Sequence, residues 1–253
     1  MNQGPIVGFV SPPKTYDPSA SEFPKVIAAP VRTQQSLLPL WDVDYQIPTI
    51  AFEMVQSALR ATARSVASCG AAVVVQMGTP FAFAGLNTEG EARARHVLLE
   101  QMTMAPVVMN ALAIVDGLRA LGTKRVALAC TYYDDEWKAS WRRFIEACRF
   151  DVVYAATMAN QGIVQTDDPF HDYGWSIAPE LTRACIVKTA EDAPDAEAIV
   201  VTGAGNRTVG RLQGLEAETG KAIVAADTAP YWAAARVAGL PLVPGILGRL
   251  GEV

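Results

Sequence analysis

Short apolar strands alternate with helices along nearly the whole chain, and this alternation is the feature that most constrains the fold. Largely apolar runs at 6–10, 73–77 and 199–202 are predicted to form buried strands. A longer amphipathic segment, 50–69, ends before Gly70 and is predicted to be a helix. Strands that alternate with helices form parallel sheets flanked by helices, so we predict an α/β fold.

The order of the predicted elements repeats, which indicates two similar halves. The strand at 6–10 corresponds to the strand at 126–129, and the strand at 73–77 to that at 199–202. We therefore predict two pseudo-symmetric domains, each a parallel sheet flanked by helices, with the active site in the cleft between them. The strand at 222–225 is expected to return to the first sheet, so the predicted domains are residues 1–115 plus about 222–253, and residues 116–221.

Two of the predicted strands end in a turn of small residues. Gly78-Thr79-Pro80 follows the strand at 73–77, and Gly203-Ala204-Gly205 follows the strand at 199–202. Such junctions expose backbone N–H groups at the carboxyl edge of a parallel sheet, where α/β proteins bind anions. Neither glycine supplies an acid, a base or a nucleophile. The turns therefore predict a pocket for an anionic ligand and restrict the chemistry it can perform.

Charge and composition argue against several classes of partner. The 253 residues carry a net charge of -5 and no block of Lys and Arg, which argues against nucleic acid and anionic membranes as partners. The longest apolar runs are too short to span a bilayer, and the first residues lack a signal-peptide pattern. The four cysteines show no C-x-x-C spacing, so we expect a cytoplasmic protein with reduced thiols. Association of the chain into a homo-oligomer is one of the expected partner types.

Four segments of the chain carry a family resemblance. They are Val75-Gln76-Met77-Gly78-Thr79, the stretch 118–129, Tyr132 with Asp134-Asp135, and Thr202-Gly203-Ala204-Gly205. Together they resemble the aspartate/glutamate racemase superfamily, and within it the branch of arylmalonate decarboxylases and maleate cis-trans isomerases. The resemblance implies two pseudo-symmetric α/β domains, a small carboxylic acid as substrate, and no cofactor or metal.

The resemblance also implies a departure at the two glycine turns. Racemases of this superfamily place one cysteine after each of the two strands, and arylmalonate decarboxylases keep only the second, which protonates the enediolate. The matching positions here are Gly78 and Gly203. Racemisation by two thiols at these positions is thereby excluded, and protonation must come from another group, such as Tyr132, Cys130, His171 or water.

The anion-binding role of the family pocket falls on identifiable residues. By resemblance, Thr79 and Tyr132 are candidate catalytic hydrogen-bond donors. The alternative for Thr79 is an ordinary turn residue, and the alternative for Tyr132 is a packed aromatic side chain. Arg207 is suited to a bidentate grip on a carboxylate, or is a solvated charge at the start of a helix. The candidate substrate-binding residues are Pro12, Pro13, Gly78, Thr79, Tyr132, Gly203, Ala204, Gly205, Asn206 and Arg207.

The segment 166–175 mixes titratable and aromatic side chains and precedes a predicted helix. This composition suits a lid, and a solvent-exposed loop is the alternative. His171 within it is a third candidate catalytic residue, because the ordinary pKa of histidine suits acid–base chemistry.

Three functions follow, in order of preference. The first is a cofactor-independent decarboxylase that acts on a malonate-type acid through an enediolate. The second is an isomerase, an eliminating enzyme or a hydrolase that uses the 166–175 segment. The third is a carboxylate-binding protein without catalysis.

Overall fold

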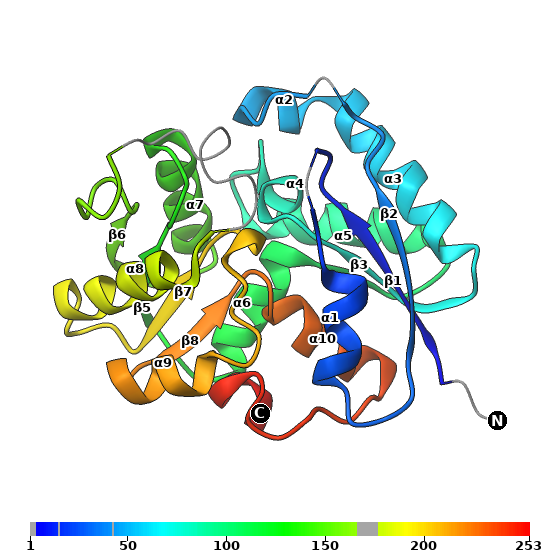
Figure 1. Ribbon diagram of the computed structural model, residues 1–253. Helices are drawn as coiled ribbons and strands as arrows, with labels where there is room; N and C mark the ends of the chain where they lie inside the picture. Colours follow the sequence, from blue (N-terminus) through cyan, green and yellow to red (C-terminus); the bar gives the residue numbers. More distant parts are fainter. Residues whose placement is uncertain (1–3, 15, 42, 166–176) are drawn as a thin grey trace. The chain divides into compact units, whose positions relative to one another are not determined.

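The structure is a computed structural model that describes residues 4–14, 16–41, 43–165 and 177–253. Its contacts divide the chain into two compact units. Unit 1 comprises Met1–Ala113 and Pro230–Val243, and unit 2 comprises Ile114–Ala229 and Pro244–Val253. Each unit contains a four-stranded parallel sheet flanked by helices, which confirms the predicted α/β class (Figure 1).

The sheet of unit 1 has the strand order β2-β1-β3-β4. The inner strands are buried over nearly their whole length, because helices cover them. Their sequences are accordingly almost continuous runs of apolar residues. The edge strand β2 is polar and half-exposed. The strands are β1 (Ile6–Ser11), β2 (Arg32–Leu37), β3 (Ala71–Gln76) and β4 (Val107–Met109).

The helices of unit 1 bury one apolar face each. In α3, which lies within the amphipathic segment predicted at 50–69, Val55, Leu59 and Val66 are buried, and the helix packs on β1 and β3. The predicted helix at 50–69 is divided in two, because Phe52 takes an extended conformation between α2 and α3. The helices are α1 (Ser19–Val26), α2 (Ile47–Ala51), α3 (Glu53–Ala67), α4 (Thr79–Phe83), α5 (Glu89–Thr103), α6 (Asn110–Ala120) and α10 (Ala229–Ala238), with α6 and α10 carrying the chain between the units.

The sheet of unit 2 has the order β6-β5-β7-β8, which matches unit 1 strand for strand. This equivalence confirms the predicted similarity of the two halves. The strands are β5 (Arg125–Ala129), β6 (Asp151–Ala156), β7 (Ala198–Val201) and β8 (Ala222–Ala225), and the helices are α7 (Asp135–Ala147), α8 (Pro179–Asp192) and α9 (Leu212–Thr219), with the short 3-10 helices η1 (Ala204–Asn206) and η2 (Gly248–Glu252).

The prediction that the strand at 222–225 returns to the first sheet is wrong. This strand, β8, pairs in parallel with β7, from Ala198↔Ala222 to Val201↔Ala225. The chain crosses to unit 1 only afterwards, where Tyr231 of α10 packs edge-on against Phe9 and Phe23, at centroid distances of 6.0 and 5.7 Å. A four-residue apolar strand fits beside any buried neighbour, so its sequence does not specify its sheet.

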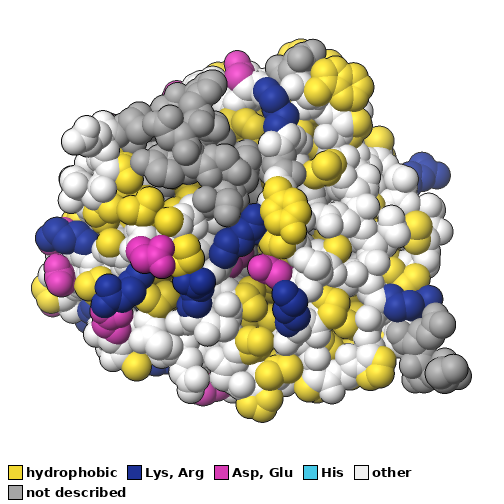
Figure 2. Space-filling view, in the orientation of Figure 1, with side chains coloured by type: hydrophobic (Ala, Val, Ile, Leu, Met, Phe, Trp, Pro, Cys, Tyr) yellow, Lys and Arg dark blue, Asp and Glu magenta, His cyan; other side chains and the backbone are white. Residues whose placement is uncertain are grey.

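Charges are dispersed over the surface. Figure 2 shows basic and acidic side chains interspersed on the described part of one face, without a broad patch of either sign. Within the described ranges, no helix combines the length and the apolar character that a bilayer crossing requires.

Candidate active site

Gly78 forms the first turn, at the carboxyl end of β3 in unit 1. Its φ of +85° is a conformation that favours glycine. A Cβ added there would lie 2.5 Å from Cγ of Pro12, in the loop after β1, and 3.2 Å from the Phe81 ring. The two predicted prolines are both buried, and the Tyr45 hydroxyl donates to the Pro13 carbonyl. Pro12 therefore fills the space that a side chain at 78 would need.

Thr79 is fully buried at the start of α4, and its hydroxyl is tied to the neighbouring loop. Its Oγ1 lies 2.8 Å from Oδ1 of Asn110, directly after β4. A 180° rotation of the Asn110 side-chain amide exchanges its oxygen and its nitrogen. Asn110 then donates to Thr79 Oγ1, and the Thr79 hydroxyl can direct its proton to a ligand. Gln76 completes the network, with Nε2 donating to the Gly78 carbonyl at 2.8 Å. Side chains of β3 and of the following loops thus hold this turn.

Gly203 forms the equivalent turn in unit 2, at the carboxyl end of β7. Its φ is +90°, and a Cβ added there would lie 2.4 Å from both Cζ and the hydroxyl oxygen of Tyr132. Tyr132 follows β5, the strand equivalent to β1, and is 8% exposed. In both units, therefore, a side chain from the loop of a neighbouring strand occupies the space over the glycine. No side chain fits at 203 unless Tyr132 moves.

The environment of Tyr132 keeps its phenol protonated. Burial raises the pKa of the hydroxyl far above its ordinary value, outweighing the opposing effects of the Gly205 backbone N–H and the Arg207 charge. The Asp227 carboxylate adds to the rise. The hydroxyl accepts a hydrogen bond from Gly205 and retains its own proton. Tyr132 is thus equipped to donate a hydrogen bond or a proton, and not to act as a base at neutral pH.

Asn206 holds the near end of the second turn. It is buried, and its Nδ2 donates to the carbonyls of Thr202 and Gly203, both at 2.6 Å. Its Oδ1 accepts from the Thr182 hydroxyl at 3.1 Å. These bonds engage the amide within unit 2, and a contact between Asn206 and a substrate stays a prediction.

Asp227 holds the far end of this turn, and sequence reasoning missed it. The Thr208 N–H donates to its Oδ2 at 2.5 Å, and the Thr208 hydroxyl to its Oδ1 at 2.7 Å. Asp227 is 2% exposed and lies just after β8, at the carboxyl edge. Arg207, immediately before Thr208, takes a φ of +55°. The signal available in the sequence was an acidic residue two positions after a short apolar strand.

The predicted site residues thus gather at two equivalent edges, each within its own unit. Tyr132 and the turn 203–207 lie at the carboxyl ends of β5 and β7, with Ala204 half-exposed at the start of η1. His171 lies outside the described residues. The described residues include no group of three or more His, Cys, Asp and Glu side chains that could hold a metal ion. In unit 1 the gathered residues are Pro12, Pro13, Gly78 and Thr79 at the ends of β1 and β3.

Two buried cysteines lie near the second turn. Burial raises the pKa of Cys185 to about 12, and it raises the pKa of Cys130 further. Cys130 is fully buried and its thiol is hydrogen-bonded with the Thr202 side chain. Both groups stay protonated and packed, which argues against a thiolate at this edge.

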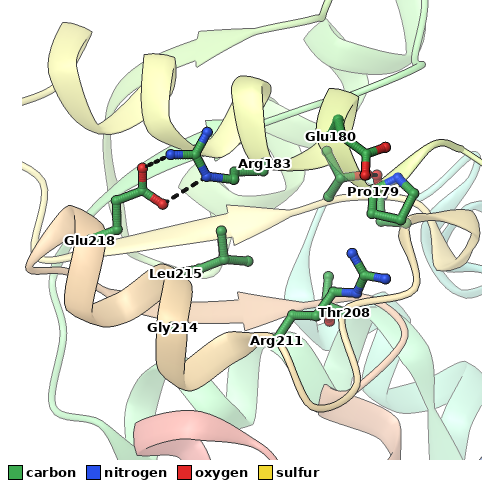
Figure 3. A pocket seen from close by; sticks show the side chains of 10 residues that line it. Pro179, Glu180, Arg183, Thr208, Arg211, Gly214, Leu215 and Glu218 are labelled. Carbon is green, nitrogen blue, oxygen red and sulfur yellow. Dashed lines mark hydrogen bonds and ion pairs between the residues drawn. The ribbon is translucent and has the colours of Figure 1, made fainter.

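A pocket of about 350 Å³ lies between α8 and α9 in unit 2 (Figure 3). Asn206 and Thr208 line it, so it reaches the residues that hold the second turn. Arg183 and Glu218 form an ion pair across it, with Nε and Oε2 2.9 Å apart.

An apolar groove of about 600 Å³ lies in unit 1, on the segment that carries Tyr45. Leu40, Val43 and Pro48 contribute to its walls, and Trp41 and Phe52 stand 73% and 61% exposed. Tyr45 joins this segment to the first turn, because its ring meets Phe81 edge-on at 6.1 Å. The groove is thus a surface suited to an apolar group.

Comparison with known proteins identifies the family. The family model described as arylmalonate decarboxylase matches residues 24–250. The chain is 30% identical to arylmalonate decarboxylase of Bordetella bronchiseptica over 187 residues, which is 70% of this chain and 69% of that protein.

Solved structures agree with this match. Unliganded arylmalonate decarboxylase superposes with a TM-score of 0.79 at 25% identity, covering 98% of this chain and 99% of the other. A Nocardia farcinica maleate cis-trans isomerase variant with a covalently bound succinylcysteine intermediate shares the fold, with a TM-score of 0.79 at 20% identity and 97% of both chains covered. With the family model spanning most of the sequence, the chain belongs to the arylmalonate decarboxylase and maleate isomerase family of the aspartate/glutamate racemase superfamily.

Proposed function

We propose that this protein is a cofactor-independent carboxy-lyase that decarboxylates a small malonate-type acid through an enediolate. Cleavage of one C–C bond releases carbon dioxide and leaves the electron pair on the α-carbon, delocalised into the remaining carboxylate. The α-carbon then takes one proton to give the monocarboxylic acid. The protein must therefore stabilise an oxyanion and deliver a proton.

The observation that carries the proposal is the protonated Tyr132 phenol packed over the Gly203 turn. Its oxygen accepts a hydrogen bond from Gly205, and burial keeps the hydroxyl protonated by raising its pKa. Preorganised donors of this kind stabilise a developing oxyanion, and removal of one typically costs about 10²- to 10³-fold in kcat. In unit 1, the Thr79 hydroxyl backed by Asn110 is proposed to bind a substrate carboxylate.

Tyr132 is also the proposed proton donor. By resemblance, residue 203 is the position of the thiol that protonates the enediolate in the decarboxylases, and here the phenol occupies the space of a side chain at 203. An enediolate carbon is a far stronger base than a phenolate, so a raised phenol pKa does not prevent the transfer. Solvent then restores the proton to Tyr132. His171 remains the second candidate.

The apolar groove of unit 1 is proposed to receive the substrate's side group. Its walls offer aliphatic and aromatic carbon, and Tyr45 links it to the first turn. An apolar surrounding also favours loss of a carboxylate, because it replaces the hydration shell of the charged group. This argument favours aryl- or alkylmalonates over malonate itself.

The test is release of carbon dioxide from a panel of phenyl-, alkyl- and unsubstituted malonates. Tyr132→Phe should lower kcat about 10²- to 10³-fold by loss of one oxyanion donor, and more if the phenol also delivers the proton. The matched control is Tyr133→Phe, which removes the neighbouring buried hydroxyl and should leave kcat unchanged. Full turnover by Tyr132→Phe would contradict the role of the phenol.

Isomerisation of a cis-dicarboxylate is the second candidate, favoured by the shared fold with maleate isomerases. Conversion of maleate to fumarate, with no carbon dioxide from any malonate, would select it over decarboxylation. Thermal stabilisation by these acids without turnover of any would instead indicate a binding protein.

A further inference from the structure

The two glycine turns are tied to their sheets by equivalent contacts. In unit 1, Thr79 after β3 is hydrogen-bonded to Asn110 after β4. In unit 2, Thr208 in the loop after β7 is hydrogen-bonded to Asp227 after β8. Since β3 and β4 are the counterparts of β7 and β8, Asp227 is the topological counterpart of Asn110. The two differ in charge: one is a neutral amide and the other a carboxylate.

The contact in unit 2 is the stronger of the two. One carboxylate takes both the N–H and the hydroxyl of Thr208, and hydrogen bonds to an ionised acceptor are about twice as strong as neutral ones. Asp227 is almost completely buried, and a buried carboxylate is costly unless it is compensated. The site therefore keeps a buried carboxyl group, held by two hydrogen bonds, where the other half of the fold uses an amide.

The contact acts on a residue with an uncommon backbone conformation. Arg207 has a φ of +55°, which few residues other than glycine adopt. Asn206 anchors the residues before it through two backbone carbonyls, and Thr208 is anchored directly after it. The backbone at Arg207 is thus held from both sides. The charges of Arg207 and Asp227 both act on Tyr132, so all three belong to one cluster.

We propose that Asp227 is a positioning residue, which through Thr208 holds the turn 203–208 and so orients Arg207 and the donors around Tyr132. Its effect on catalysis rests on the proposed function, whereas its effect on the turn does not. Because small misplacements of catalytic groups can cost about 10²-fold in rate, loss of the contact should lower kcat much more than it raises KM.

The experiment compares Asp227→Asn and Thr208→Val with two controls. Thr208→Ser keeps both hydrogen bonds. Glu216→Gln neutralises another buried carboxylate of unit 2, which accepts the N–H groups of Ile223 and Arg249 away from the turn, at 3.0 and 2.8 Å. Amide hydrogen exchange of residues 203–208, kcat and KM on the malonate panel, and the thermal midpoint are measured for each.

Asp227→Asn and Thr208→Val should speed exchange at 203–208 and lower kcat about tenfold to 10²-fold, with KM changed less than about threefold. Thr208→Ser should match the wild type. Glu216→Gln should lower the thermal midpoint without changing exchange in the turn or kcat. Unchanged exchange and kcat in Thr208→Val, or the same kinetic loss in Glu216→Gln, would overturn the proposal. If the wild type releases no carbon dioxide, the proposed function fails while exchange still tests the turn; if Asp227→Asn does not fold, Thr208→Val decides.

Discussion

At the scale of single residues, the site is defined by the side chains that pack against its two glycines. Pro12 closes the space over Gly78 and Tyr132 closes that over Gly203. Each contact joins loops of neighbouring strands, so no local pattern in the sequence could predict it. The glycines themselves were predictable as turn residues. That a phenol fills the second space emerges only when β5 and β7 are paired.

The contact between Tyr132 and residue 203 has a measurable energetic consequence. Gly203→Ala should lower the free energy of unfolding by about 1–3 kcal/mol through overpacking, in addition to the cost of its positive φ. Gly210→Ala is the matched control, because Gly210 has a φ of +73° in the same loop and nothing within 4 Å of an added Cβ. Urea unfolding measures both.

A second variant isolates the clash. Tyr132→Ala should recover much of the penalty of Gly203→Ala, so that the double variant is more stable than the sum of the single changes predicts. Strict additivity would show that Tyr132 does not occupy the space. The same reasoning predicts that Gly203→Cys needs a smaller residue at 132 before a thiol can be accommodated.

At the scale of elements, sequence periodicity predicted the strands that carry the two glycine turns and the helix that covers the first sheet. The amphipathic face of α3 and the strands β1, β3, β5 and β7 lie where the pattern indicated. The break at Phe52 was missed, because the residues on both sides favour a helix. Asp227 and Asn110 were missed as site residues for a different reason: each acts through contacts with the loop that follows the neighbouring, earlier strand of its sheet.

The cap of α7 provides a prediction at this scale. Asp134 accepts a hydrogen bond from the Trp137 N–H at 2.7 Å, whereas Asp135 forms an exposed ion pair with Lys138. Asp134→Ala should therefore cost about 1 kcal/mol of unfolding free energy. Asp135→Ala should cost less than about 0.5 kcal/mol, as expected for a surface ion pair. Equal losses in urea unfolding would contradict this assignment of the cap.

At the scale of the whole molecule, the α/β class and the matching order of the two sheets followed from the alternation of elements. The sheet that receives β8 did not, because a strand of four apolar residues can pair with a buried strand of either sheet. The proposed proton donor follows instead from the pairing of β5 and β7, which brings Tyr132 over Gly203.

The return of the chain through α10 makes unit 1 discontinuous in sequence. Its aromatic cluster of Phe9, Phe23 and Tyr231 is completed by a residue near the carboxyl end. Tyr231→Ala should make residues 4–113 more sensitive to protease than residues 114–229, because it removes a ring of unit 1 and leaves the segments of unit 2 intact. Equal protection of both regions in that variant would show that the third ring is dispensable.

This discontinuity bears on how the protein is made. Segments usually fold in the order in which they leave the ribosome. Here the first segment to emerge lacks Tyr231 and the rest of α10 until residues 114–229 have been synthesised. Phe9 and Phe23 thus remain without their third ring while most of unit 2 is made. Unit 2 in turn is completed only by Pro244–Val253, so each unit waits for a segment that is translated after most of the other.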